Sequence, residues 1–97
     1  MNYIQEGNRI YLKENDIIIA EINFSKVNDN TYDIFKTYVD PNYRGKGLAS
    51  KLMKEVVNFI YDKNCNVTAS CSYAKNWLEK NNICDIINVG GKNERRK

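Results

Sequence analysis

The chain has no histidine, a single proline and no long apolar run. Because histidine is the commonest metal ligand among side chains, we expect no zinc site. No apolar stretch approaches the roughly 18 residues that a membrane-spanning helix needs, and residues 1–6 lack the basic and apolar regions of a signal peptide. These absences predict a cytoplasmic protein that neither spans nor binds a membrane.

Cysteine is also scarce, and its count is odd. The three cysteines, Cys65, Cys71 and Cys84, include no Cys-x-x-Cys pair. That pattern favours free thiols in a reducing compartment over a disulfide framework. Free cysteine often serves as a small buried apolar residue, and we expect this packing role for Cys65 and Cys84.

The remaining composition is that of one small globular domain. Hydrophobic residues make up 42% of the 97 positions, and aromatic residues make up 11%. The net charge of +3 belongs to residues 92–97, Lys-Asn-Glu-Arg-Arg-Lys, since the rest of the chain is balanced. We therefore predict one domain over residues 1–91 and a disordered basic tail over 92–97. The tail is interpreted as solubilising, with a nucleic-acid contact as the alternative.

Alternating apolar residues predict strands in the first forty positions. Residues 9–13 and 16–24 are expected to form two strands around a turn at 14–16, followed by a polar turn at 27–30 and a third strand at 31–39. In the second strand, one face is expected to carry Ile18, Ala20, Ile22 and Phe24, and the other Ile17, Ile19, Glu21 and Asn23. The pattern is that of an antiparallel meander.

Helical spacing begins after the only proline, Pro41. A helix over residues 47–62 is indicated by Leu48, Leu52, Val56 and Ile60, which recur at intervals of four. A fourth strand is expected at 66–70, parallel to the third after a right-handed crossover. Ser72 is a candidate N-cap for a second helix over 73–81, whose inward residues would be Ala74, Trp77 and Leu78. The fold class is therefore α+β, an α/β sandwich.

The junction between the third strand and the first helix is rich in glycine and in positive charge. Arg44-Gly45-Lys46-Gly47 lies there, and no acidic residue occurs between Pro41 and Lys54. A helix N-terminus directs free N–H groups and a positive dipole end at one point, which suits a phosphate or pyrophosphate. An ordinary helix start with a solvated basic face would look similar. A nucleoside triphosphatase loop is excluded because the G-x-x-x-x-G-K-[S/T] spacing is absent.

The same residues resemble a known family. Arg44-x-x-Gly47-x-Ala49 matches the Q/R-x-x-G-x-G/A signature for acyl-CoA in the GNAT N-acetyltransferase superfamily, and the resemblance extends over residues 9–83. The segment Cys71-Ser72-Tyr73-Ala74, with Trp77 and Lys80-Asn81, resembles the short single-domain YjdJ-type branch, which has a cysteine near the bound cofactor.

This resemblance implies acetyl-CoA as acyl donor and a minimal GNAT fold. In that fold the two parallel strands splay apart and the pantetheine arm lies between them. The implied cofactor-binding residues are Val39, Arg44, Gly45, Lys46, Gly47, Leu48, Ala49, Ser50 and Asn76. Cys71, just before a helix N-terminus where thiolate is favoured, is the implied catalytic residue, although simple packing remains open. Tyr73 is a candidate proton donor to the leaving thiolate, with packing as its commoner role.

The implied reaction is acetyl transfer to an amine, by one of two routes. The amine attacks acetyl-CoA directly while an Asp, a Glu or the Cys71 thiolate takes its proton, or Cys71 carries the acetyl group first. A backbone N–H near Val39 is the expected oxyanion donor. The N-terminal helices of larger family members are missing, so an open face suits a protein or peptide amine. The alternatives are a non-catalytic acyl-CoA-binding module and a small nucleic-acid-binding domain. The acceptor, the acyl-chain preference and the oligomeric state, monomer or weak dimer, are left open.

Overall fold

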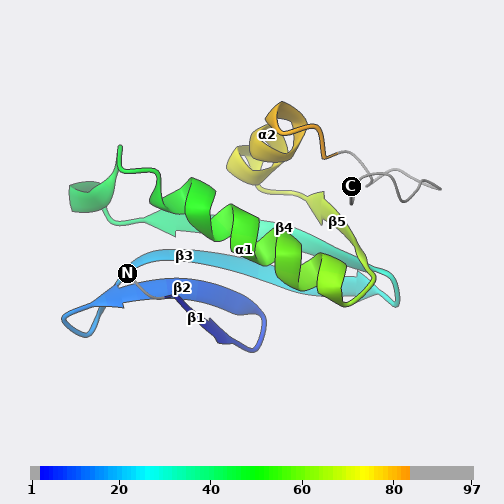
Figure 1. Ribbon diagram of the computed structural model, residues 1–97, viewed down its shortest axis with the longest axis horizontal. Coiled ribbons are helices and arrows are strands. Elements are labelled where there is room, and N and C mark those ends of the chain that lie inside the picture. The colour runs from blue at the N-terminus through cyan, green and yellow to red at the C-terminus, as the bar shows by residue number, and fades with distance from the viewer. Residues whose placement is uncertain (1–2, 84–97) are drawn as a thin grey trace.

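A computed structural model describes residues 3–83, which form one sheet and two main helices (Figure 1). In chain order the elements are β1 (Tyr3–Glu6), β2 (Arg9–Glu14), β3 (Ile17–Asn28), β4 (Thr31–Val39), the 3-10 helix η1 (Pro41–Tyr43), α1 (Leu48–Asp62), β5 (Asn66–Ala69) and α2 (Ser72–Lys80). The expected α+β class is confirmed. The predicted tail and Cys84 lie outside the described residues, so the domain boundary at residue 91 stays a prediction. None of the described helices is long and apolar enough to cross a bilayer.

The strands pair in the order in which they occur in the chain. Strands β1 to β4 form an antiparallel meander, and β5 adds to β4 in parallel, as expected. The β2–β3 hairpin turns at Asn15 and Asp16, which both have positive φ, a conformation that these two residue types tolerate. Strand β3 continues to Asn28, so the next turn is shorter than the predicted 27–30. Strand β1 was not expected from the sequence, because its four exposed residues show no buried face.

One apolar core lies between the sheet and the helices. Helix α1 crosses the sheet (Figure 1) and buries the predicted stripe together with Met53 and Val57. Between α1 and the sheet, the ring of Phe59 from α1 packs with those of Phe24 and Tyr32 at centroid distances of 5.4–6.2 Å. The expected inward residues of α2 are buried in the same cluster. This packing fixes where the first turn of α1 lies relative to the end of β4.

The two helices also touch through a polar contact. Trp77 Nε1 donates a hydrogen bond of 2.9 Å to the Ser50 hydroxyl in the first turn of α1. Because Trp77 is buried, its indole N–H needs a partner, and Ser50 supplies one within the protein. Helix α2 is therefore held against the N-terminal part of α1 by both apolar burial and a hydrogen bond.

Three register shifts, at Ile19 and Val27 in β3 and at Phe35 in β4, interrupt the strict alternation that the sequence predicts. Ile19 is an extra residue in β3 opposite Leu12 and Lys13, and Phe35 is an extra residue in β4 opposite Asn23 and Phe24. The predicted two-residue period in β3 is consequently wrong at its start, where Ile19 is buried at 1% exposure. In β4, the core-facing residues before the bulge are Tyr32 and Ile34. After the bulge they are Thr37 and Val39, which pair with the core-facing Ile22 and Ala20.

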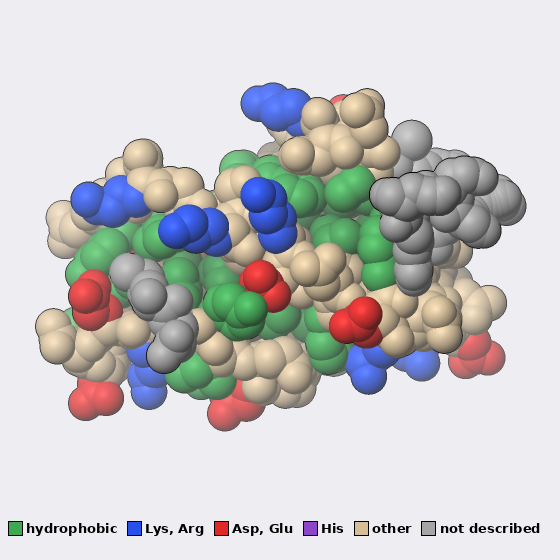
Figure 2. Space-filling model, in the orientation of Figure 1, with side chains coloured by type: hydrophobic (Ala, Val, Ile, Leu, Met, Phe, Trp, Pro, Cys, Tyr) green, Lys and Arg blue, Asp and Glu red, His purple; other side chains and the backbone are tan. Residues whose placement is uncertain are grey.

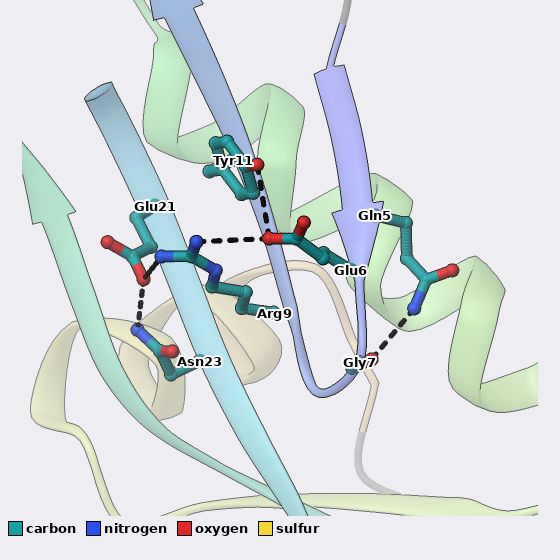
Figure 3. A network of polar contacts seen from close by, with 7 residues as sticks. All are labelled: Gln5, Glu6, Gly7, Arg9, Tyr11, Glu21 and Asn23. Atoms are coloured by element: carbon teal, nitrogen blue, oxygen red, sulfur yellow. Dashed lines mark hydrogen bonds and ion pairs between the residues drawn. The ribbon is translucent and has the colours of Figure 1, made fainter. Parts of the chain in front are cut away.

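The other face of the sheet carries a polar network instead of a helix. Arg9 contacts Glu21 at 3.0 Å and Glu6 at 3.1 Å, and its guanidinium lies 4.3 Å from the centre of the Tyr11 ring. Asn23 also donates to Glu21, and in Figure 3 these side chains lie on the near side of the strands with α1 behind. Hydrogen bonds from Arg9 and then Tyr11 hold the pKa of Glu6 below its ordinary value. We call this side the outer face; within residues 3–83 both helices lie on the opposite side.

Candidate functional site

The loop after β4 is held by contacts from both of its ends. Asp40 accepts a 2.8 Å bond from the Asn42 N–H and starts η1, and Arg44 Nε donates to the Val39 carbonyl at 3.2 Å. Tyr43 reaches back to the β2–β3 hairpin, where its hydroxyl donates to Glu14 at 2.7 Å. These bonds place the loop beside the start of α1.

Gly47 sets the geometry of that helix start. Its φ of 76° and ψ of 15° are left-handed, which glycine adopts without strain, and it is the N-cap of α1 without a side-chain bond. The first N–H bonded within the helix is that of Lys51, to the Gly47 carbonyl at 3.1 Å. The N–H groups of Leu48, Ala49 and Ser50 therefore have no partner in the helix. The first turn contains no acidic residue, so the junction can bind an anion.

Basic side chains strengthen this property. Figure 2 shows them gathered over the η1–α1 loop and the first half of α1. Their positive charge adds to the positive end of the helix dipole, so a phosphate is favoured electrostatically at this end of the molecule.

A groove of about 330 Å³ opens at the same junction. Of the residues expected at a cofactor site, it is lined by Val39, Arg44, Gly45, Gly47, Leu48, Ala49 and Ser50, together with Tyr73. The exposed Lys46 and Asn76 do not line it. Sequence reasoning missed three lining residues, Thr37, Tyr38 and Tyr43. No sequence signal marks Thr37, because only the bulge at Phe35 turns it toward the core face.

The pairing of β4 with β5 ends on the side of the sheet toward this groove. Their parallel pairing runs from Thr31 and Asn66 to Ile34 and Ala69. Beyond it, the Ile34 carbonyl accepts N–H groups from both Ser70 and Cys71, at 3.0 and 3.2 Å. Strand β5 ends at Ala69, its last paired residue, and residues 35–39 of β4 continue without a β5 partner. The expected splay of two continuing strands therefore stays a prediction.

Cys71 lies two residues after the end of β5. It is the N-cap of α2, with φ −82° and ψ 129°, and its carbonyl accepts the first helical bond, from Lys75 at 2.9 Å. The prediction of Ser72 as N-cap was therefore wrong by one residue, since Ser72 is already helical. The Cys71 sulfur is 3.5 Å from Thr37 Oγ1 and is partly buried.

The surroundings of Cys71 favour its thiolate. Burial alone raises the pKa of the thiol, but hydrogen bonds from Thr37 Oγ1 and from three backbone N–H groups outweigh that effect. Those N–H groups belong to Ala74, Tyr73 and Thr37. The net pKa of Cys71 lies below its ordinary value, so more thiolate is present at neutral pH than for a free cysteine.

Replacing Thr37 by valine should raise the pKa of Cys71, because the side-chain donor to the thiolate is lost while the shape is kept. Only the thiolate is alkylated, and the lowered pKa of Cys71 keeps part of it as thiolate at lower pH. We therefore expect the alkylation rate of Cys71 in Thr37→Val to rise at higher pH than in wild type. Iodoacetamide labelling followed at the level of the Cys71 peptide measures this. Cys65, 4% exposed, is the internal control for slow labelling. An unchanged profile in Thr37→Val would show that the hydroxyl does not tune the thiol.

The other proposed groups have simpler surroundings. Tyr73 lines the groove at 39% exposure, and burial raises the pKa of its phenol, so it stays protonated at neutral pH. The Cys65 thiol is buried and donates toward the Lys63 carbonyl at 3.5 Å, in agreement with its expected packing role.

This glycine-rich helix start beside the parallel β4–β5 pair is the arrangement that the family resemblance implies. Residues 9–86 match the family model described as GCN5-related N-acetyl-transferase, and the chain belongs to this family. The predicted superfamily is thereby confirmed, whereas the YjdJ-type branch stays a prediction.

Solved structures agree with this assignment. A GCN5-like protein from Staphylococcus aureus, described as a candidate N-acetyltransferase, is 31% identical with a TM-score of 0.73, covering 96% of this chain and 92% of that one. The ribosomal-protein-S18-alanine N-acetyltransferase from Escherichia coli is 19% identical with a TM-score of 0.61, covering 78% and 53%. A predicted acetyltransferase from Clostridium acetobutylicum, solved with acetyl-CoA, is 20% identical with a TM-score of 0.60, covering 92% and 65%. The last two show the fold alone. No curated protein matches.

Proposed function

We propose that this protein transfers an acetyl group from acetyl-CoA to an amine. The observation that carries the proposal is that one groove joins the open N-terminus of α1 to Thr37 and Tyr73. Cys71 does not line this groove, but its sulfur lies 3.5 Å from Thr37 Oγ1. An acyl-CoA has a pyrophosphate at one end and a thioester at the other. The groove therefore offers chemistry suited to both ends.

Within this proposal the cofactor residues divide by position. The N–H groups from Gly47 to Ser50 and the Arg44 side chain would bind the pyrophosphate, and Val39 would lie beside the pantetheine arm in the gap. Lys46 and Asn76, which lie outside the groove lining, would contact outer parts of the nucleotide. Family membership and the acetyl-CoA complex of the C. acetobutylicum protein support this arrangement.

Cys71 serves the chemistry in one of two ways. Its thiolate attacks the thioester carbonyl carbon, the bond from that carbon to the CoA sulfur breaks, and the amine nitrogen then displaces the cysteine. Alternatively, the amine attacks acetyl-CoA directly and the thiol only lines the site. In both cases we propose the Thr37 N–H, one of the backbone groups that lower the pKa of Cys71, as the oxyanion donor in place of one near Val39.

A non-catalytic acyl-CoA-binding module is the second candidate, because the same groove could bind an acyl-CoA without transferring its acyl group. We also propose that the protein acts in the cytoplasm, as a monomer or weak dimer, on an amine of a protein or peptide. Free thiols and the open sheet face support these assignments. Nucleic-acid binding through the basic loop is disfavoured, since the loop's charge lies beside a groove that suits an acyl-CoA.

Intact mass spectrometry after incubation with acetyl-CoA tests the role of Cys71. We expect wild type to gain one acetyl group that hydroxylamine removes, and Cys71→Ala to gain none while it still binds CoA in native spray. Cys65→Ala is the matched control and should be acetylated as wild type is. Bound CoA without a labile acetyl group would favour direct transfer or the binding module, which an amine panel separates. Wild type that binds no CoA would refute the proposed function.

A further inference from the structure

Trp77 is the only tryptophan of the chain, and its indole N–H has a partner within the protein. The ring belongs to α2 and is 9% exposed, so water has little access to it. Nε1 donates a hydrogen bond of 2.9 Å to the hydroxyl oxygen of Ser50 in the first turn of α1. Because a buried N–H without a partner is costly, we expect this bond to persist throughout the folded domain.

The direction of this bond decides what the Ser50 hydroxyl can still do. An indole N–H only donates, whereas a hydroxyl accepts and also donates one proton. Ser50 must therefore accept from Trp77, which leaves its own proton for a different acceptor. A serine near a helix start can donate to a carbonyl three or four residues earlier, but within residues 3–83 the Ser50 hydroxyl makes no second hydrogen bond.

Ser50 faces the groove at the start of α1. It is half-buried and lines the groove beside Gly47, Leu48 and Ala49, and its backbone N–H also lacks a partner in the helix. Trp77 does not line this groove. An effect of the indole N–H on a ligand in the groove must therefore pass through Ser50.

We propose that Trp77 is a positioning residue for the diphosphate of an acyl-CoA: it holds the Ser50 oxygen so that the Ser50 hydroxyl donates its proton into the groove. This inference rests on the proposed function. Phosphate oxygens only accept hydrogen bonds, and a bond from a hydroxyl to a charged oxygen is stronger than one between neutral groups. A donor that is oriented before the ligand arrives loses less rotational freedom on binding.

The same bond joins the two helices that carry the two ends of the site. Cys71 is the N-cap of α2, and Tyr73, which lines the groove, lies about one turn before Trp77 on that helix. Ser50 belongs to the helix start that would bind the diphosphate. The contact between Trp77 and Ser50 therefore ties the position of α2, with its thiol, to the position of the diphosphate site.

Calorimetric titration with CoA tests the proposal. We expect Trp77→Phe, which keeps an aromatic ring without the N–H, to weaken CoA binding about fivefold, and Ser50→Ala to weaken it about tenfold. The double variant should bind no more weakly than Ser50→Ala, because the N–H acts through the hydroxyl. Ser50→Thr keeps a hydroxyl and should bind within about twofold of wild type. Losses that multiply in the double variant, or no loss in Trp77→Phe, would overturn the proposal.

Two comparisons separate the N–H from the packing of α2. Leu78→Ala truncates a neighbouring buried side chain that cannot form hydrogen bonds, so it should lower the urea midpoint but leave CoA affinity within about twofold of wild type. If Trp77→Phe does not fold, an amino acid with a benzothiophene side chain at this position keeps the ring shape and removes only the N–H. It should show the fivefold loss. An equal loss in Leu78→Ala would show that packing is responsible and would overturn the role of the N–H.

The single indole also gives a direct spectroscopic signal. When the Ser50 hydroxyl donates to a phosphate, its oxygen becomes a stronger acceptor, so the indole proton of Trp77 should move downfield in the NMR spectrum as CoA binds. In Ser50→Ala this proton should lie upfield and respond little to CoA. Wild type that binds CoA without the downfield shift would overturn the role of Trp77 and leave the proposed function intact. Wild type that binds no CoA would refute the proposed function itself.

Discussion

Gly47→Glu should weaken CoA binding about 1,000-fold, which corresponds to about 4 kcal/mol. Position 47 is the N-cap of α1 at φ 76°, and a Cβ added there would meet no atom within 4 Å. The loss would therefore come from backbone strain and from charge rather than from a clash. A carboxylate about 4 Å from a phosphate charge costs roughly 4 kcal/mol at a surface-like dielectric. Calorimetry or native mass spectrometry with CoA measures the loss.

Two matched variants separate the charge from the strain. Gly47→Asn keeps a residue type that tolerates positive φ and adds no charge, so it should bind CoA within about tenfold of wild type. Gly47→Ala adds strain without charge and should fall between the two. If all three variants bind CoA equally well, the start of α1 does not bind the pyrophosphate, and the groove must be assigned differently.

Phe24→Ala should destabilise the domain by about 3–5 kcal/mol. Phe24 has no exposed surface and packs against Tyr32 and Phe59, with ring centroids at 5.9 and 5.4 Å. Truncation leaves a cavity under α1 and removes both ring contacts. Since small domains are stable by only about 5–15 kcal/mol, a loss of this size removes a large share of the free energy of unfolding. Urea unfolding followed by circular dichroism gives the change.

Phe35→Ala is the control for this prediction. Phe35 is on the neighbouring strand but half exposed, so its truncation should cost less than about 1 kcal/mol. A similar midpoint shift for both variants would show that the aromatic cluster under α1 contributes no special stability. A change in the urea slope for Phe24→Ala would indicate an altered denatured state instead.

Periodicity was enough to predict the elements with one clearly buried face. The stripe that begins at Leu48 and Leu52 predicted α1 to within one residue, and the β-branched and aromatic run at 31–39 predicted β4 with its observed bounds. Ala74, Trp77 and Leu78 likewise marked the inner face of α2. Such patterns predict the structure well because each element buries its own apolar face, and the spacing of that face is visible in its own residues.

The sequence could not predict features that depend on pairing between distant residues. The bulges at Ile19 and Phe35 exist only relative to partner strands, so alternation gave the wrong face for Ile19 and no sign that Thr37 turns inward. The hydrogen bonds that Asp33 accepts likewise come from Thr68 and Ser70, 35 and 37 positions away. The glycine loop, in contrast, was predicted from local residues because its geometry is local.

The bulge at Phe35 has a consequence for how the chain can be edited. Because of the bulge, Tyr32 and Ile34 before it and Thr37 and Val39 after it all face the core. One residue more or fewer between Ile34 and the loop would point Thr37 and Val39 to the outer face of the sheet. We therefore expect insertions and deletions in this segment to disrupt the groove. Tags, reporters and inserted peptides belong instead at the Asp29-Asn30 turn, at the far end of the β3–β4 hairpin, where added length leaves the phase of both strands intact.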